Sequence, residues 1–269
     1  MLAGICEFTT LQASFEEDLR VFRAAGLGGI GVCELKLPPD GTAAALLRES
    51  GLRATACVPA VPGILPLPLL EGPDEVEVRV DALCASVRRL AELEPECVLV
   101  LTGPGPERRD LVVEGIRRIA EAGREAGVRV ALEPVHPTQR EVFSFVSSIG
   151  DAVSLLDEAG TPDVGLLVDV WHVGDDPDLV SHPDRIYGVH VADRREPTRS
   201  HFDRLLPGDG VLPLPRILRT IREAGYAGWY DVEVFSDDGT FGEPFPDSLW
   251  AEDPAEVARR AREGLERLL

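Results

Sequence analysis

The sequence predicts a single (β/α)₈ TIM barrel, one domain that spans residues 1–269. The chain has 269 residues, close to the roughly 250 residues of a typical barrel of this kind. Its β-rich apolar runs are short and continuous, as expected of parallel strands buried on both faces. Helical patterns separate these runs regularly, and no linker or low-complexity tract interrupts them.

Eight apolar runs are the predicted strands. They cover residues 2–8, 29–35, 53–59, 97–103, 129–135, 164–170, 186–192 and 229–235. Eight strands that each precede a helix favour a closed barrel over an open doubly wound sheet.

The first connection illustrates why a helix is predicted between strands. Ser14 and Glu17 form a capping box, and Gly26 stands where the helix should end. The same reasoning predicts helices at 74–93, 107–126, 144–159 and 213–224, and a last one that opens at Asp253 and Pro254.

Composition limits the classes of partner. The net charge of −20 repels phosphate backbones and anionic lipids, so neither nucleic acid nor a membrane is an expected partner. The N-terminal residues lack the pattern of a signal peptide, and no apolar stretch is long enough to span a bilayer, which predicts a cytoplasmic protein. The five cysteines form no CxxC pair and are expected to be buried core residues.

Four polar residues lie where late strands end, which is where active sites of parallel barrels are built. They are Glu133, Asp169, His190 and Glu233. Three buried carboxylates on adjacent strand ends repel one another unless a cation lies among them. The sequence therefore predicts a metal site, and its oxygen-rich ligands suit Mn²⁺, Mg²⁺ or Co²⁺ better than structural Zn²⁺. The alternative for each residue alone is a hydrogen-bonded structural group.

Residues that follow these ligands are candidates for substrate contact. His172 comes three residues after Asp169 and is expected to face a metal-bound substrate, unless it lies in a surface turn. Trp171 is expected either to form the bottom of a sugar-sized pocket or to pack in the interior. His136 is a candidate for holding Glu133 in place.

Other loops supply further candidates. Arg194 and Arg195 follow His190, and one of them is expected in the site because a guanidinium suits carboxylate or vicinal oxygens. Glu34 is expected to bound the pocket, or to form a rim ion pair with Lys36. The proline-rich segment 58–70 is expected to wall or cover the mouth. His182 and His201 are expected at the surface.

The sequence resembles the xylose isomerase-like superfamily of sugar phosphate isomerases and epimerases. The resemblance rests on ALEP with Glu133, LLVDVWHV with Asp169 and His172, GVHVADRR with His190, and PGDG followed by a helix and a last strand with Glu233. It covers about residues 130 to 240, and segment 236–250 resembles the inosose dehydratase and isomerase branch.

The resemblance implies a divalent metal held by Glu133, Asp169, His190 and Glu233, with His172 and an arginine in contact with substrate. In the epimerases of this group the arginine comes six residues after the metal histidine, where this chain has Glu196, so Arg195 is the expected substitute. The implied partner is a small polyol or keto-sugar substrate, and a homo-oligomer is left open.

The expected chemistry is proton abstraction next to a carbonyl, with the glutamates Glu133 and Glu233 as acid and base, in a sugar isomerase or epimerase. An inosose-type dehydratase would use the same site. A non-catalytic sugar-binding barrel is a third possibility, although a binder has no use for two bases at one ion. A barrel endonuclease that uses three zinc ions needs more histidines than the five present and a basic face.

Overall fold

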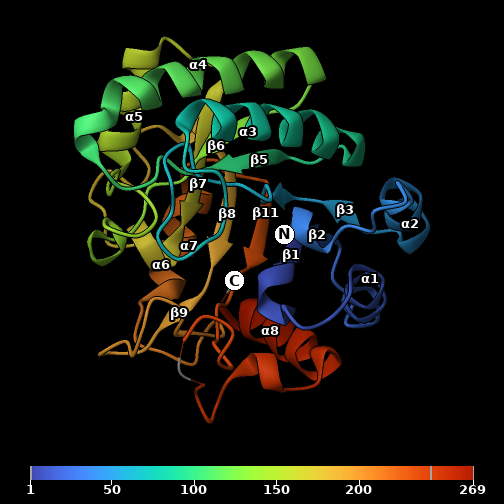
Figure 1. Ribbon diagram of the computed structural model, residues 1–269. Coiled ribbons are helices and arrows are strands. Elements are labelled where there is room, and N and C mark those ends of the chain that lie inside the picture. Colours follow the sequence, from blue (N-terminus) through green and yellow to red (C-terminus); the bar gives the residue numbers. More distant parts are fainter. Residues whose placement is uncertain (1, 243, 269) are drawn as a thin grey trace.

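The barrel in the computed structural model, which describes residues 2–242 and 244–268, consists of parallel strands surrounded by helices (Figure 1). Glu243 of segment 236–250 lies outside the described residues. The strands of the barrel are β1 (Leu2–Cys6), β2 (Gly29–Gly31), β3 (Arg53–Ala54), β4 (Ala56–Cys57), β5 (Cys97–Val100), β6 (Val130–Leu132), β7 (Val164–Asp169), β8 (Ile186–Val191) and β11 (Trp229–Val232). A separate antiparallel pair is formed by β9 (Asp193–Arg194) and β10 (Arg204–Leu205).

The strand order shows how the barrel closes. It runs β3-β2-β1-β11-β8-β7-β6-β5-β4, so that β3 and β4 stand at the two ends. Only Thr55 separates these two strands in the chain, and its carbonyl accepts hydrogen bonds from the backbone N–H groups of Glu96 and Cys97. β3 therefore pairs with β2 while β4 pairs with β5, and one stretch of chain closes the ring. The predicted barrel fold is confirmed, with the third predicted strand split in two.

Helices connect the strands. The α-helices are α1 (Phe15–Ala24), α2 (Ala43–Ser50), α3 (Val76–Leu90), α4 (Arg109–Ala126), α5 (Ile149–Ala159), α6 (Val170–Val173), α7 (Leu214–Glu223) and α8 (Pro254–Leu268). Short 3₁₀ helices are η1 (Glu7–Thr10), η2 (Glu34–Lys36), η3 (Ala91–Leu93), η4 (Pro106–Arg108), η5 (Pro137–Gln139), η6 (Pro183–Arg185) and η7 (Leu249–Ala251). The Ser14 hydroxyl accepts the N–H of Glu17 at 3.2 Å, as the capping box predicts, and Gly26 follows with φ +81°.

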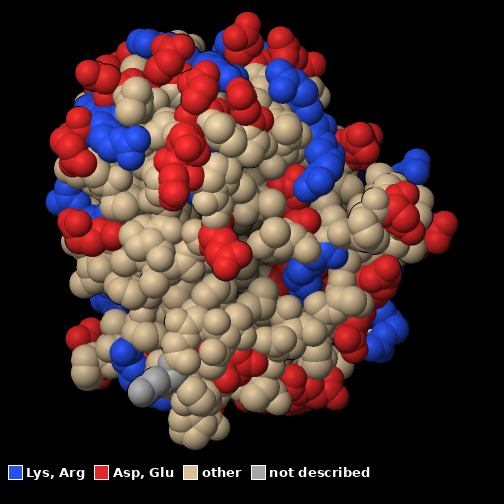
Figure 2. Space-filling model, in the orientation of Figure 1, with Lys and Arg blue, Asp and Glu red and all other residues tan. Residues whose placement is uncertain are grey.

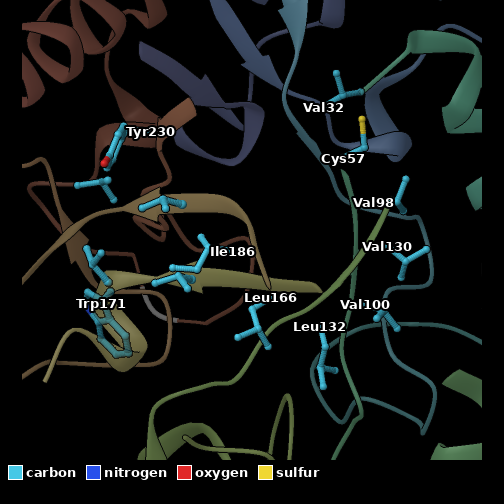
Figure 3. Packing of buried hydrophobic residues seen from close by; sticks show 14 of the residues in the cluster. Val32, Cys57, Val98, Val100, Val130, Leu132, Leu166, Trp171, Ile186 and Tyr230 are labelled. Atoms are coloured by element: carbon cyan, nitrogen blue, oxygen red, sulfur yellow. The ribbon is translucent and has the colours of Figure 1, made fainter. Parts of the chain in front are cut away.

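The strands separate two apolar layers because successive side chains point to opposite faces. Val98, Val130 and Leu166 point outward, where they pack against the helices (Figure 3). Leu99, Ala131 and Leu167 belong to a smaller cluster inside the barrel. A residue two positions beyond Ala131 or Leu167 therefore points inward as well, at the carboxyl end of its strand.

The surface carries charges of both signs. On the face seen in Figure 2, acidic and basic side chains are interspersed around the edge, and the central part is mainly uncharged. All five cysteines are buried as free thiols, which confirms the expectation for them. In the part of the chain that the structure describes, no helix has the length and apolar character needed to cross a bilayer.

Candidate metal and substrate site

The four polar residues at the strand ends come together inside the barrel. Asp169 closes β7, His190 lies in β8, and Glu133 and Glu233 directly follow β6 and β11. These four strands are consecutive neighbours in the sheet, and Asp169 and His190 are register partners. One ligand atom from each residue lies within 4.8 Å of all the others, and all four residues are buried.

The sheet fixes the backbones of both glutamates. The N–H of Glu133 donates to the carbonyl of Val100 at 3.1 Å, and the N–H of Glu233 donates to the carbonyl of Val191 at 3.1 Å. Because each glutamate is held by a bond to the next strand, its side chain continues the inward alternation of its own strand. The sequence places these carboxylates in the site through strand geometry alone.

The three buried carboxylates lie close together and shift the pKa values of the groups in the cluster. Burial and the charges of Glu233 and Asp169 raise the pKa of Glu133 well above its ordinary value. Burial alone would lower the pKa of His190, but the charges of Glu233, Glu133 and Asp169 raise it to about 10. The cluster therefore attracts positive charge strongly.

Arg204 on β10 supplies part of that positive charge. Its Nη1 donates to Oδ2 of Asp169 at 2.7 Å and to Oε2 of Glu233 at 2.9 Å, and its guanidinium is buried. Burial alone would raise the pKa of Glu233, but His190 and Arg204 outweigh burial and lower it to about 2. Sequence reasoning did not identify Arg204.

The residues present fit a divalent cation. With His190 neutral, the form in which an imidazole binds a metal, the three carboxylates and the Arg204 guanidinium carry a net charge of minus two, which one divalent cation neutralises. Nε2 of His190 is buried without a hydrogen-bond partner among the described residues, and Nδ1 lies 3.3 Å from Oε2 of Glu233. A buried imidazole nitrogen without a partner is an unusual feature that a metal ion would satisfy.

His172 stands beside this cluster in α6. Its Nδ1 accepts the backbone N–H of His136 at 3.0 Å, and burial together with Arg204 lowers the pKa of His172 well below its ordinary value. A neutral imidazole has one acceptor nitrogen, so this bond places the ring proton on Nε2. Nη2 of Arg204 lies 3.0 Å from that same Nε2. Since both groups are then donors, this contact is not a hydrogen bond, and it leaves both N–H groups able to donate to an acceptor oxygen.

The structure corrects the expected role of His136. Its backbone orients His172, whereas its ring contacts Thr138 and the edge of Trp171. It therefore supports the histidine of the site and not Glu133.

Trp171 is placed in the interior. It is buried beneath the site, with its ring packed edge-on against His172 and with the Arg204 guanidinium 5.2 Å from its centroid. Since it does not line the pocket, the packing alternative describes it, and its contribution is to support His172 and Arg204.

Glu34 and Lys36 belong to two separate polar networks. Oε2 of Glu34 accepts the N–H of Ala60 at 2.6 Å and the hydroxyl of Ser86 at 2.7 Å. Lys36 pairs instead with Asp18 and with Glu7. Glu34 does not line the pocket and does not pair with Lys36, because it is buried where it anchors segment 58–70 to α3.

The cluster opens into a pocket of about 640 Å³, counting its open mouth. Its polar side chains are Glu133, His172, His201, Arg204 and Glu233. Five phenylalanines also line it, namely Phe8, Phe143, Phe202, Phe235 and Phe241. Segment 58–70 contributes Val58, Pro62 and Leu70, which agrees with its expected role as a wall. His201, expected at the surface, lines the pocket as well, with Nδ1 2.6 Å from Oε1 of Gln139.

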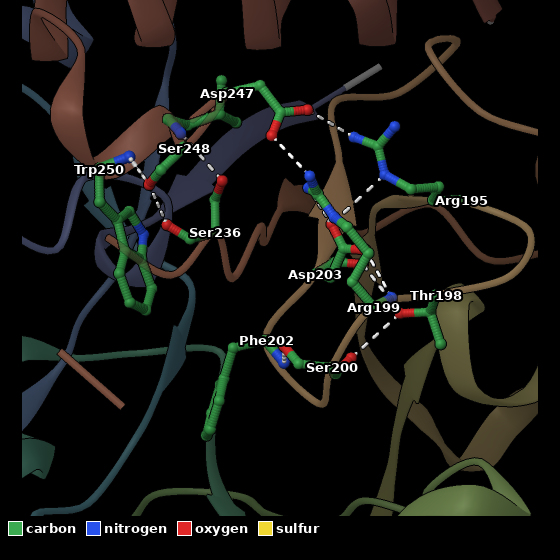
Figure 4. A network of polar contacts seen from close by, with 11 residues as sticks. Arg195, Thr198, Arg199, Ser200, Phe202, Asp203, Ser236, Asp247, Ser248 and Trp250 are labelled. Carbon is green, nitrogen blue, oxygen red and sulfur yellow. Dashed lines mark hydrogen bonds and ion pairs between the residues drawn. The ribbon is translucent and has the colours of Figure 1, made fainter. Parts of the chain in front are cut away.

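Arg195 lies outside the pocket, in a cluster of ion pairs with Arg199, Asp203 and Asp247 that we call the clamp (Figure 4). Arg195 and Arg199 both bind Asp203 and Asp247, so the loop between β9 and β10 is tied to the segment before η7. Arg194 also faces acidic groups, Asp175 and Glu196. Of these arginines after His190, Arg204 is the one that lines the pocket.

The residues on either side of Asp203 face the opposite way. Figure 4 shows Phe202 pointing away from the clamp, and both Phe202 and Arg204 line the pocket. Phe202 and Arg204 thus lie on one side of the chain and Asp203 on the other, where Phe202 belongs to a turn and Arg204 opens β10. The clamp therefore holds a pocket wall and the buried guanidinium through the one residue between them.

The fold and site together define a class of protein, an α/β barrel with a candidate cation centre at the carboxyl ends of its strands. The chain belongs to the xylose isomerase-like TIM barrel family, whose sequence model matches residues 19–268. The resemblance found in the sequence is thereby confirmed.

Curated relatives carry names of sugar-converting enzymes. An inosose isomerase of Halalkalibacterium halodurans is 28% identical over 153 residues, which cover 54% of this chain and 48% of the relative. An inosose dehydratase of Geobacillus thermodenitrificans is 26% identical over 164 residues, which cover 54% of this chain and 53% of the relative. The chain spans about half the length of these curated relatives, and their names agree with the predicted inosose branch.

Solved structures match over nearly the whole chain. A protein of Sinorhizobium meliloti 1021 superposes with a TM-score of 0.86 at 29% identity, covering 99% of this chain and 98% of that one. The IolI protein, solved with a zinc atom bound, superposes with a TM-score of 0.79 at 18% identity, covering 100% of this chain and 98% of that one. At that identity, the second likeness shows the fold alone.

Proposed function

We propose that this chain is a divalent-metal-dependent isomerase or epimerase that moves a proton next to the carbonyl group of a small hydroxy-carbonyl substrate. The observation that carries the proposal is the convergence of Glu133 and Glu233 on one buried cluster at the base of a pocket. They come from β6 and β11, with β7 and β8 between them. Two carboxylates that approach a substrate from different strands suit removal of a proton and its return at another position.

The ligands proposed for the ion are Glu133, Asp169, His190 and Glu233. A divalent cation bound there would polarise the substrate carbonyl and stabilise the negative charge that develops when the neighbouring carbon loses its proton. Three carboxylates with one imidazole favour Mn²⁺, Mg²⁺ or Co²⁺. Zinc belongs in the test as well, because the related IolI barrel contains it.

His172 and Arg204 are proposed to orient the substrate. The bond from the His136 backbone leaves a proton on Nε2 of His172, and this N–H points to the pocket where a substrate oxygen can accept it. Arg204 carries several donors in a rigid plane, which suits the oxygen that becomes negative during proton transfer. Its burial excludes water from that oxygen and so strengthens the interaction.

The experiment is proton exchange in D₂O. The metal-loaded protein is incubated with inososes, ketohexoses and hydroxypyruvate, and exchange of the proton next to the carbonyl is followed by NMR. We expect Glu233→Gln to lower the exchange rate by about 10²- to 10⁴-fold, since it removes an acid–base group. Glu141→Gln, which changes an exposed residue, serves as the matched control and should keep the rate. No exchange with any compound that is shown to bind the metal-loaded protein would contradict proton abstraction.

A dehydratase is the second candidate, and the inosose dehydratase among the relatives favours it. The same first proton transfer followed by loss of a neighbouring hydroxyl gives elimination in place of isomerisation. Mass spectrometry separates the two outcomes, because only the dehydratase product lacks one water. A non-catalytic barrel would show no rate in either assay, and its Glu233→Gln variant would bind ligand as the parent does.

A further inference from the structure

The apolar character of the pocket bears on the substrate, and the inference drawn from it rests on the proposed function. Beyond the cluster, the walls consist mainly of phenylalanine, leucine, valine and proline side chains. Of the five polar side chains that line it, four belong to the proposed metal and orienting groups. The fifth is His201, whose Nδ1 is already bonded to Gln139.

Such walls do not suit the outer part of a free polyol. Each hydroxyl that leaves water needs a hydrogen-bond partner, and a buried hydroxyl without one weakens binding. Apart from Nε2 of His201, the described lining side chains offer these partners only beside the cluster, where a hydroxy-carbonyl group would lie. The rest of the ligand therefore meets carbon atoms.

The phenylalanines form walls that suit a flat apolar group. Phe202 and Phe241 are stacked with ring centroids 4.5 Å apart, and Phe143 meets Phe202 edge-on at 6.0 Å. Phe8 and Phe235 lie 4.8 Å apart. Aromatic faces and edges of this kind bind planar rings by offset stacking and edge contacts.

The apolar walls come from several independent parts of the chain. Phe8 belongs to η1, Phe143 to the connection between β6 and α5, and Phe241 to the segment after β11. Phe202 lies next to Asp203, so that the clamp holds its segment against the segment before η7 (Figure 4). The apolar surface is thus assembled by the fold and is not the property of one loop.

We propose that the substrate carries an apolar group about the size of a phenyl ring beyond its hydroxy-carbonyl head. The head binds at Glu133 and Glu233, and the ring lies among the phenylalanines. An unsubstituted polyol chain is then a poor ligand.

The test compares ligands that share one head. Isothermal titration calorimetry measures the binding of hydroxymethyl benzyl ketone, erythrulose and dihydroxyacetone to the metal-loaded protein. All three are hydroxymethyl ketones, and they differ in carrying a phenyl group, a polyol chain or neither. We expect hydroxymethyl benzyl ketone to bind about 10- to 100-fold more tightly than the other two, as burial of an aromatic ring predicts.

Variants locate the effect. Phe143→Ser and Phe241→Ser change half-buried wall residues and should each weaken binding of the benzyl ketone severalfold, with little effect on dihydroxyacetone. Leu35→Ser, at an apolar residue that is 72% exposed and away from the pocket, is the control and should change neither. Benzyl ketone binding that is unchanged by both wall variants would overturn the assignment of the ring to these walls.

The outcomes distinguish this proposal from the proposed function. If erythrulose binds as tightly as the benzyl ketone or more tightly, the substrate class is overturned while the metal-dependent chemistry stands. If none of the three ketones binds while the metal is shown to be bound, the hydroxy-carbonyl head is overturned and both proposals fall.

Discussion

Replacement of Glu133 by glutamine tests whether a cation holds the buried carboxylates together. Glu133 is 6% exposed and faces Asp169 and Glu233, whose charges together with burial raise its pKa well above the ordinary value. Glutamine has nearly the same shape and no charge, so it removes the repulsion. We expect metal-free Glu133→Gln to unfold at a higher temperature than the metal-free parent.

The metal response should change in the opposite direction. A cation at a hundred times its Kd stabilises a protein by about 2.7 kcal/mol. For a chain of 269 residues, about 2.1 cal/mol/K of unfolding entropy per residue converts this into a Tm increase of about 5 °C. If the variant binds about a hundredfold more weakly, the same cation concentration adds about 0.4 kcal/mol and less than about 1 °C.

Differential scanning calorimetry of chelator-treated protein, with and without Mn²⁺, measures both effects. Glu141→Gln, an exposed charge change of the same type, should leave both the metal-free Tm and the metal response as in the parent. A variant that is less stable without metal and still gains about 5 °C with it would refute the idea that repulsion at Glu133 is relieved by a cation.

Three further predictions concern the scaffold. Hydrogen bonds from Arg199 outweigh burial and lower the pKa of Asp203, so its stabilising contribution is present above the ordinary aspartate pKa and lost as pH falls through the lower folded value. Asp203→Asn should therefore lower the free energy of unfolding, measured with urea at pH 7, by about 1.5–3 kcal/mol, and this loss should become smaller toward pH 3. A loss that stays the same at both pH values would argue against the clamp. A Cβ at Gly4 would overlap Oδ1 of Asp231 inside the barrel, so Gly4→Ala should lower the free energy of unfolding by about 1–3 kcal/mol, and an unchanged value would speak against this packing. Arg79 donates hydrogen bonds to the carbonyls of Gly63 at 2.7 Å and Pro73 at 2.9 Å. Arg79→Leu should therefore speed proteolysis within residues 58–75. An unchanged cleavage rate would show that other contacts hold this segment.

The sequence predicts the barrel and its polar cluster because both follow from local pattern. A buried parallel strand is a continuous apolar run, and the polar residue that closes the run keeps the inward direction of its strand. Glu133, Asp169, His190 and Glu233 all lie within one residue of the carboxyl end of a strand. Their convergence depends only on neighbouring strands ending at the same side of the sheet.

The remaining site residues depend on loops, where pattern gives little information. Arg204 reaches Asp169 and Glu233 because the chain between β9 and β10 folds back, and β10 has only two residues and no apolar run. Arg195 is close to His190 in sequence, but its guanidinium binds Asp247, which lies 52 residues further along the chain. The pairing of distant segments decides which arginine enters the site. The local sequence around Arg195 and Arg204 does not distinguish them.

The short stretch from Phe202 to Arg204 bears on the length of ligand that the pocket suits. Phe202 and Arg204 stand two residues apart and both line the pocket, and ion pairs hold Asp203 between them. The ion pairs of Asp203 therefore oppose a change in the distance between these two side chains when a ligand binds. We expect a ligand that matches this spacing to contact both side chains, and a shorter or longer ligand to contact only one of them.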